Sequence, residues 1–230
     1  MSELGILKKD TKYRDRLLEK IDSLPENEKS RHPFFKGIKM QAHHLISADG
    51  VSDLEDEDLL ISAGYNINKI NNIVLIPCTF SGACHLGTQL HRGNHTSTVD
   101  MDESLDETYD DDDHPDSYHE TVEKMVVKAL RKPSVECVDL GGGRNDKIKE
   151  MDEISGDMVS LINNFSPRAQ LTKVFQAFNN DGLQSKIGCS GAVSMKNHKM
   201  SLTCPSHRDH EGEVITIKKS HEAYKLRAGN

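Results

Sequence analysis

The 230-residue sequence contains no tryptophan, and aromatic residues make up only 5% of it. No apolar run approaches the roughly 18 residues of a membrane-spanning helix, so we expect no integral membrane protein and no membrane partner. The first ten residues lack the apolar stretch of a secretory signal. Five cysteines without regular close spacing do not predict a disulfide framework. The chain is long enough for one moderate domain, or one domain with a smaller appendage.

The negative charge of the chain is concentrated in one stretch. The formal net charge of −8 argues at first against a polyanionic partner. The stretch from Asp100 to Asp116 contains ten of the 37 acidic residues and no lysine or arginine. The rest of the chain has 27 acidic and 29 basic residues. Such a run typically forms a solvated loop. A sharper interpretation is that it shields a basic site.

Hydrophobic patterns predict a mixture of helices and short strands. Strands are expected at 40–47 and at 73–76, where an apolar β-branched run stops at Pro77. Helices are expected at 10–22, from a capping box at Ser52 to Gly64, and from Pro115 to Pro133. Gly141 to Gly143 is interpreted as a hinge, with helices at 150–163 and 168–178 and short strands at 183–219 beyond it.

Histidines form the groups that carry chemistry. His43 and His44 are adjacent on a predicted strand, so their side chains point to opposite sides. His91 and His95 are four residues apart, a spacing that brings two rings to one face, as a metal needs. His114 directly precedes the helix predicted from Pro115, and Asn72 directly precedes the strand predicted at 73–76.

Taken as an ordered set, these pieces resemble the AHH family of HNH, or His-Me finger, nucleases. The matching pieces are Ala42-His43-His44, Asn72 before an apolar strand, His91-x-Gly-x-His95, and His-Pro-x-x-Tyr before a helix. The resemblance spans roughly 38–131 and implies an α+β fold with a ββα-metal core and flanking helices. We therefore expect an N-terminal helical segment at 1–36, the nuclease core at 37–133 with an acidic insertion at about 100–113, and a C-terminal mixed α/β extension at 144–230.

The resemblance also implies a role for each matching residue. His43 would bind one divalent metal ion, and His44 would be the general base, held by the side-chain carbonyl of Asn72. His91 and His95 would complete the metal site, with His114 in reserve, because the acidic stretch separates His95 from the helix where the family usually has none. Three histidines suit Zn²⁺, Ni²⁺, Mn²⁺ or Mg²⁺ with water, so the ion stays open.

The resulting hypothesis is a metal-dependent, largely nonspecific DNA endonuclease that acts as an antibacterial toxin or effector. Arg92, Lys128 and Arg131 are candidate phosphate contacts, although a solvated helix face explains the last two equally well. We expect export by a specialised secretion machine or carrier, activity in the target-cell cytoplasm, and an immunity protein in the producer. The alternatives are an RNase, a mobile-element or site-specific nuclease, and a non-catalytic, zinc-stabilised interaction module.

Overall fold

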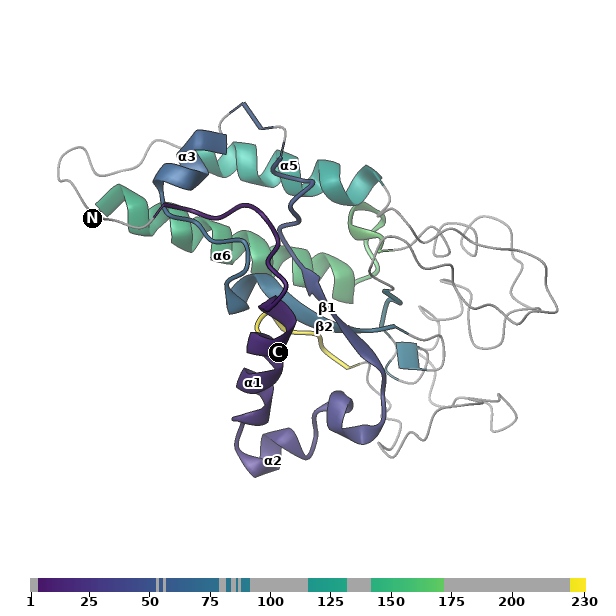
Figure 1. Cartoon of the computed structure of the whole chain (residues 1–230). Coiled ribbons are helices and arrows are strands. Elements are labelled where there is room, and N and C mark those ends of the chain that lie inside the picture. The colour runs from purple at the N-terminus through teal and green to yellow at the C-terminus, as the bar shows by residue number, and fades with distance from the viewer. Residues whose placement is uncertain are drawn as a thin grey trace.

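The computed structural model describes part of the chain, and the fold is built from these residues alone. They are 4–52, 54–55, 57–78, 82–83, 86, 88–91, 116–131, 142–171 and 224–230. Their helices and small antiparallel sheet make an α+β fold, as the sequence predicts. Figure 1 shows the sheet in the middle of the molecule, with α5 and α6 on one side and α1 and α2 on the other.

The sheet pairs two strands that are far apart in the sequence. Strand β1 (Met40–His44) runs antiparallel to β2 (Ile73–Pro77), and Ala42 lies opposite Leu75. Both strands were predicted: β2 from its apolar β-branched run, and β1 from the mixed segment 40–47, of which the strand takes only the first part. Side chains alternate across a strand, and accordingly Val74 and Ile76 join one hydrophobic cluster while Ile73 and Leu75 join another.

The face of the sheet that carries Leu75 is covered by α1 (Tyr13–Asp22), which confirms the predicted helix. Leu17 and Ile21 lie one turn apart on α1, and both are fully buried against Met40 and Ala42. The short helix α2 (Glu26–Lys29) and the 3₁₀ turn η1 (Pro33–Lys36) then lead into β1. The first strand is therefore fixed between an N-terminal helix and its partner strand.

The helix between the strands starts later than the sequence predicts. The capping box was expected to begin a helix at Ser52, but α3 spans only Glu57–Ser62. The hydroxyl of Ser52 donates instead to the carbonyl of Asp49 at 3.3 Å, so it does not cap a helix. Gly64 ends this helix in the left-handed region, with φ +75°, as its position after the helix predicted.

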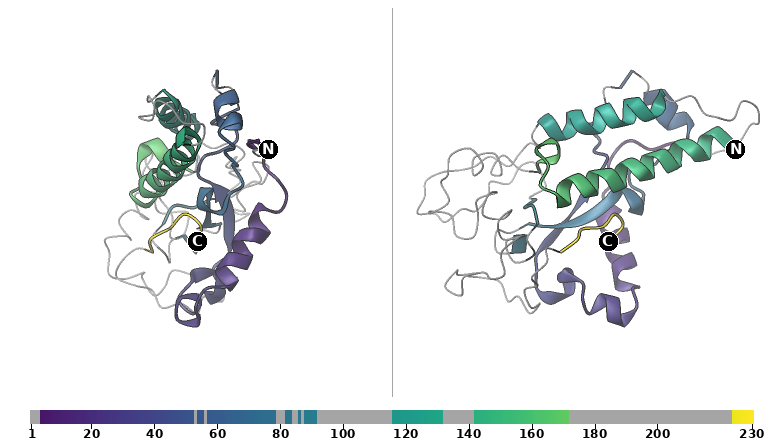
Figure 2. Two further views of the ribbon diagram at one scale, coloured as in Figure 1. Left: turned by 90° about the vertical axis from the view of Figure 1, so that its left-hand side faces the viewer. Right: turned by 180° about the vertical axis from the view of Figure 1, so that it is seen from behind.

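The opposite face of the sheet is covered by two long helices, α5 (Asp116–Leu130) and α6 (Gly142–Asn163). The apolar face of α5 packs against the sheet: Val122 and Val126 are fully buried, and Met125 is half-buried. Met151 and Met158 of α6 join the same hydrophobic cluster. Figure 2 shows the two helices side by side in both views.

The region that was interpreted as a hinge is partly helical, because Gly142 and Gly143 are the first residues of α6. Helix α6 also contains the predicted 150–163 helix. The domain bounds near 36, 133 and 144 stay predictions. Helices α5 and α6, which lie on either side of the bounds at 133 and 144, contribute to the same hydrophobic cluster. The predicted strands at 183–219 and most of the predicted 168–178 helix lie outside the described residues, apart from the 3₁₀ turn η4 (Pro167–Ala169).

The last residues of the chain return to the sheet. The backbone N–H of Gly229 donates to the carbonyl of Ile73, and the N–H of Leu75 donates to the carbonyl of Asn230. The side chain of Asn163 at the end of α6 bonds both the N–H and the carbonyl of Leu226. Strand β2 therefore has β1 along one edge and the C-terminal residues along the other. Among the described residues, none of the helices has the length and apolar character needed to cross a membrane.

Candidate active site

The two adjacent histidines of β1 lie on opposite faces of the sheet. In the register, His43 lies opposite Val74 and His44 opposite Ile73, so each faces the hydrophobic cluster of its partner. His43 accordingly contacts Tyr118 of α5, and His44 contacts Tyr13 of α1. The alternation predicted from the sequence therefore separates the two rings and gives each a different environment.

On the α5 face, His43 and His91 bring two ring nitrogens together. The Nδ1 atom of His43 lies 3.1 Å from the Nε2 atom of His91, and both side chains are buried. On the other side of the His43 ring, Nε2 lies 2.7 Å from the hydroxyl of Tyr118. These two residues of the predicted metal site thus meet although 48 positions separate them.

The Tyr118 hydroxyl determines which nitrogen of His43 carries the proton. It donates its hydrogen to the carbonyl of Leu45 at 2.8 Å, and burial raises the pKa of Tyr118, so the group stays protonated. Its oxygen therefore accepts from Nε2–H of His43, and the lone pair of Nδ1 faces His91. A metal-binding histidine usually donates its second N–H to such a partner.

The facing nitrogens of His43 and His91 fit a shared metal ion. Two nitrogens bound to one tetrahedral zinc ion lie roughly 3.3 Å apart, because each bond is about 2.0–2.1 Å long. The measured 3.1 Å is close to this edge length. Within the described residues, no group of three or more His, Cys, Asp or Glu side chains gathers to hold a metal. His95 and His114, the two candidates for the third ligand, lie outside those residues.

His91 is fixed by contacts that sequence reasoning did not identify. Its backbone N–H donates to the carbonyl of Pro77 at the end of β2, at 2.9 Å. Two residues earlier, the buried side chain of Gln89 donates to the carbonyls of Ile162 and Ala169 and accepts from the N–H of Leu171. A glutamine in an irregular stretch carries no sequence signal for this role. The end of α6 and the residues after it thus anchor the segment that carries His91.

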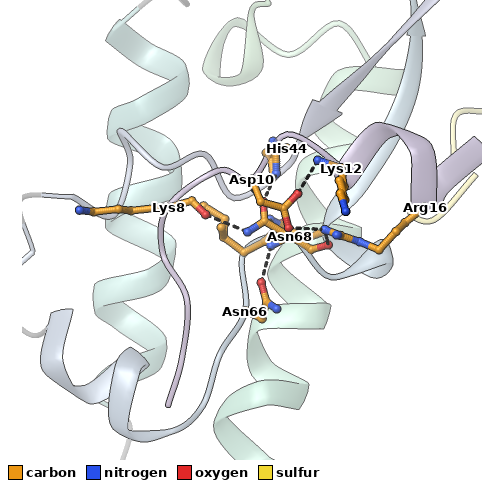
Figure 3. Close-up of polar contacts among 9 residues, drawn as sticks. Lys8, Asp10, Lys12, Arg16, His44, Asn66 and Asn68 are labelled. Atoms are coloured by element: carbon orange, nitrogen blue, oxygen red, sulfur yellow. Dashed lines mark hydrogen bonds and ion pairs between the residues drawn. The ribbon is translucent and has the colours of Figure 1, made fainter. Parts of the chain in front are cut away.

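On the α1 face, His44 is buried between an amide and an aromatic ring. Its Nε2 lies 3.2 Å from Oδ1 of Asn68, and the centroid of its ring lies 4.3 Å from that of Tyr13. Figure 3 shows Asn68 in the middle of a group of polar residues beside His44. Burial, which disfavours the charged ring, lowers the pKa of His44 to about 4, so the imidazole is neutral at pH 7.

The structure corrects the predicted partner of His44. The family resemblance implied Asn72, but the side chain of Asn72 bonds the N–H and carbonyl of Ile46, the carbonyl of Ile67 and the hydroxyl of Ser155. These bonds use both donors and both acceptor positions of the amide, so none is left for His44. The partner of His44 is instead Asn68, which precedes the 3₁₀ turn η2 (Ile70–Asn72). Both asparagines precede β2, and nothing in the local pattern distinguishes them.

Comparison with known families identifies the group to which these residues belong. The model of the AHH family, described as a nuclease family of the HNH/ENDO VII superfamily with conserved AHH, matches residues 24–154. This match spans more than half of the chain. The chain belongs to the AHH nuclease family. Searches of curated proteins and of solved structures gave no match. Nucleases of this superfamily generally use a divalent metal ion.

The match extends beyond the predicted 38–131 in both directions. It contains the conserved motif as Ala42-His43-His44 on β1, and it reaches into α6. The N-terminal residues that surround Asn68 and His44, from Lys8 to Arg16, precede the match. Two regions outside the matched residues therefore contact this AHH nuclease's candidate site, one at His44 and one at the segment of His91.

Two of the three predicted phosphate contacts, Lys128 and Arg131, belong to the described residues. Lys128 and Arg131 are exposed, at the end of α5 and just beyond it. Lys128 lies about 15 Å along the helix from Tyr118, because each residue adds about 1.5 Å. Arg92 lies outside the described residues. His119, the residue after Tyr118 on α5, bonds the hydroxyl of Ser47 at 2.9 Å.

Proposed function

We propose that this AHH nuclease is a metal-dependent, largely nonspecific DNA endonuclease that leaves a 5′ phosphate. The observation that carries the proposal is the arrangement around β1. His43 and His91 face each other with two ring nitrogens, and the adjacent His44 donates to an amide carbonyl. Two imidazoles suited to one cation and a third suited to take a proton are what metal-assisted hydrolysis requires.

His43 and His91 would hold the divalent ion, together with His95 or, in reserve, His114. The ion would polarise the scissile phosphate and stabilise the charge that develops on the leaving 3′ oxygen. The histidine ligands suit Mg²⁺, Zn²⁺, Mn²⁺ and Ni²⁺ alike, because imidazole binds several of these metals and water completes the coordination of the others. Tyr118 keeps the proton of His43 on Nε2, so that Nδ1 remains a ligand atom.

His44 would act as the general base. Since its Nε2–H is directed at Asn68, its Nδ1 is the nitrogen that accepts a proton from the attacking water. The water oxygen forms a bond to phosphorus as the bond from phosphorus to the 3′ oxygen breaks, and the 3′ oxygen leaves and takes up a proton. A neutral histidine is suited to this step because it is present as the free base near pH 7.

The decisive experiment is plasmid degradation with Mg²⁺ or Mn²⁺, with and without EDTA. We expect the wild type to cleave only with metal and His44→Ala to lose at least 100-fold in rate. His119→Gln is the matched control, because it replaces a neighbouring histidine whose bond to Ser47 glutamine can retain. Full activity of His44→Ala would contradict the general-base assignment. Tight metal binding without cleavage of any nucleic acid would favour the non-catalytic zinc module.

The biological part of the proposal is an antibacterial toxin or effector that a specialised secretion system delivers into a target cell. It rests on the nuclease family alone. Expression in the bacterial cytoplasm should then be toxic, and a neighbouring immunity protein should rescue growth. Preferential cleavage of RNA in parallel assays, or cleavage at one DNA site without toxicity, would favour the RNase or the mobile-element nuclease instead.

A further inference from the structure

The segment from Lys8 to Arg16, which precedes the residues matched by the family, surrounds the partner of His44. Its backbone contacts the side chain of Asn68 at two points, and one of its side chains contacts the backbone of Asn68. Lys8 and Asp10 are separated from Asn68 by 60 and 58 positions, so these are tertiary contacts. The segment thus reaches the candidate general base through one intermediate residue.

The two backbone contacts leave only one orientation for the Asn68 amide. Its Nδ2 donates to the carbonyl of Lys8 at 2.8 Å, and its Oδ1 accepts from the N–H of Asp10 at 3.1 Å. If the amide were flipped, two donors would face each other at Asp10 and two acceptors would face each other at Lys8. Since buried groups without partners each cost about 1–3 kcal/mol, the flipped state is strongly disfavoured.

The orientation of Asn68 in turn determines the tautomer of His44. Because Oδ1 can only accept, the His44 Nε2 that lies 3.2 Å from it must carry the hydrogen. The proton is then absent from Nδ1 of the neutral ring. A His44 with the hydrogen on Nδ1 would place two acceptors, Nε2 and Oδ1, against each other.

The segment is itself held in place by an ion pair. The carboxylate of Asp10 accepts from the N–H of Lys12 at 2.8 Å and from Arg16 at 2.8 Å, and Arg16 also donates to the backbone carbonyl of Asn68 at 3.3 Å. Hydrogen bonding to Arg16 lowers the pKa of Asp10, so its carboxylate is charged at pH 7. One turn along α1, the ring of Tyr13 packs against His44.

We propose that residues 8–16 form a positioning element that selects the reactive tautomer of His44 by fixing the amide of Asn68. The Asp10 N–H and the Lys8 carbonyl orient the amide, and Arg16 holds the loop that presents them. The role rests on the proposed function, because a selected tautomer matters only if His44 accepts a proton. Asp10 and Arg16 are positioning residues, since they act on His44 through Asn68.

The sharpest test removes the Asp10 N–H while leaving the full chain intact. Asp10→Pro lacks this donor, whereas Asp10→Ala keeps it and loses only the carboxylate. Arg16→Gln removes the ion pair without touching the backbone, and Arg16→Lys restores the charge. Lys29→Gln is the matched control, because it breaks the comparable surface pair of Lys29 with Asp22, away from the site. Thermal unfolding of each variant separates misfolding from misorientation.

The first measurement is the ¹⁵N spectrum of the His44 ring, assigned by its loss in His44→Gln and recorded above pH 7 without metal. We expect the hydrogen on Nε2 and an unprotonated Nδ1 in the wild type, in Arg16→Lys and in Lys29→Gln. We expect a tautomer mixture in Asp10→Pro, and a smaller shift in Arg16→Gln and Asp10→Ala. A hydrogen on Nδ1 in the wild type, or an unchanged tautomer in folded Asp10→Pro, would overturn the proposal.

The second measurement is the cleavage of a DNA duplex with metal. In Asp10→Pro we expect kcat to fall about tenfold with KM nearly unchanged, because binding of the duplex does not depend on the tautomer. An equal kcat in wild type and folded Asp10→Pro would overturn the positioning role and leave the nuclease proposal intact. A tautomer shift in a protein that cleaves nothing would instead contradict the proposed function while supporting the contact between the segment and His44.

Discussion

The side-chain amide of Asn72 bonds both the backbone N–H and the backbone carbonyl of Ile46, at 2.7 and 3.0 Å. An amide that does this replaces the pairing that a neighbouring strand would supply, at the point where the chain leaves β1. The hydroxyl of Ser155 in α6 binds the same Asn72 oxygen, so one buried side chain joins the residues that follow β1, the turn that precedes β2, and α6. Asn72 therefore holds the backbone at Ile46, two positions after His44.

Asn72→Ala should destabilise the protein more than any change at its exposed neighbour Asn71. The substitution leaves several buried backbone and side-chain groups without partners, so we expect the free energy of unfolding to fall by about 3–5 kcal/mol. Urea denaturation of Asn72→Ala against Asn71→Ala measures the difference. By contrast, Asn68→Ala should lower kcat by about tenfold. A stable, inactive Asn72→Ala protein would restore Asn72 to a catalytic role.

Metal binding should depend on His43, on His91 and on one histidine outside the described residues. Calorimetric titration with Zn²⁺ or Mn²⁺ should show that His95→Ala loses binding by tenfold or more and that His114→Ala keeps it. The four-residue spacing of His91 and His95 favours this choice. His119→Gln serves as the control. Loss of binding only in His114→Ala would make that residue the third ligand.

Gln89→Glu should weaken metal binding without changing any ligand. It removes the two donors that reach the carbonyls of Ile162 and Ala169 and places a carboxylate against them. We expect the free energy of unfolding to fall by about 2–4 kcal/mol, and the affinity for metal to fall because the segment of His91 loses its anchor. Titration below the melting temperature measures the affinity, with the exposed Asp157→Asn as control. Unchanged affinity in the folded variant would show that Pro77 alone fixes His91.

Acid should destabilise the fold through His32. Its Nδ1 accepts from the N–H of Phe34, and burial lowers its pKa from 6.5 to about 4. The unfolded chain therefore binds a proton at higher pH than the folded one, so this stability is complete above pH 6.5 and is lost as the pH falls toward 4. His32→Asn keeps an acceptor that does not titrate, and its loss of unfolding free energy between pH 7 and 4.5 should be about 2–3 kcal/mol smaller. Equal losses in urea titrations would contradict this assignment.

The acidic stretch should oppose DNA binding at low salt. Deleting residues 100–113 removes nine of the chain's acidic residues, so nonspecific affinity should rise at low ionic strength and converge with the wild type as salt screens the charge. Fluorescence anisotropy in a His44→Ala background measures binding without cleavage. A variant of full length with Asn and Gln in place of the acids separates charge from length. Unchanged affinity in both the deletion and the full-length variant would show that the acidic stretch does not affect DNA binding.

Local patterns in the sequence were sufficient for the elements that carry the site. An apolar run located β2, a short mixed segment indicated β1, and prolines at both ends of a periodic apolar pattern located α5. Alternation along a strand already required His43 and His44 to face opposite sides. The ordered motifs were sufficient for the family. These features depend on neighbours within a few residues, whose geometry the backbone repeats along an element.

Only the tertiary structure decided which side chains serve each histidine. Asn68 rather than Asn72 meets His44, Gln89 anchors the segment of His91 to the end of α6, and Lys8 and Asp10 orient Asn68. The partners in these contacts are 24 to 73 positions apart. Their choice depends on how the helices pack on the sheet and on which buried amide can satisfy all its hydrogen bonds, and no pattern within one segment contains that information.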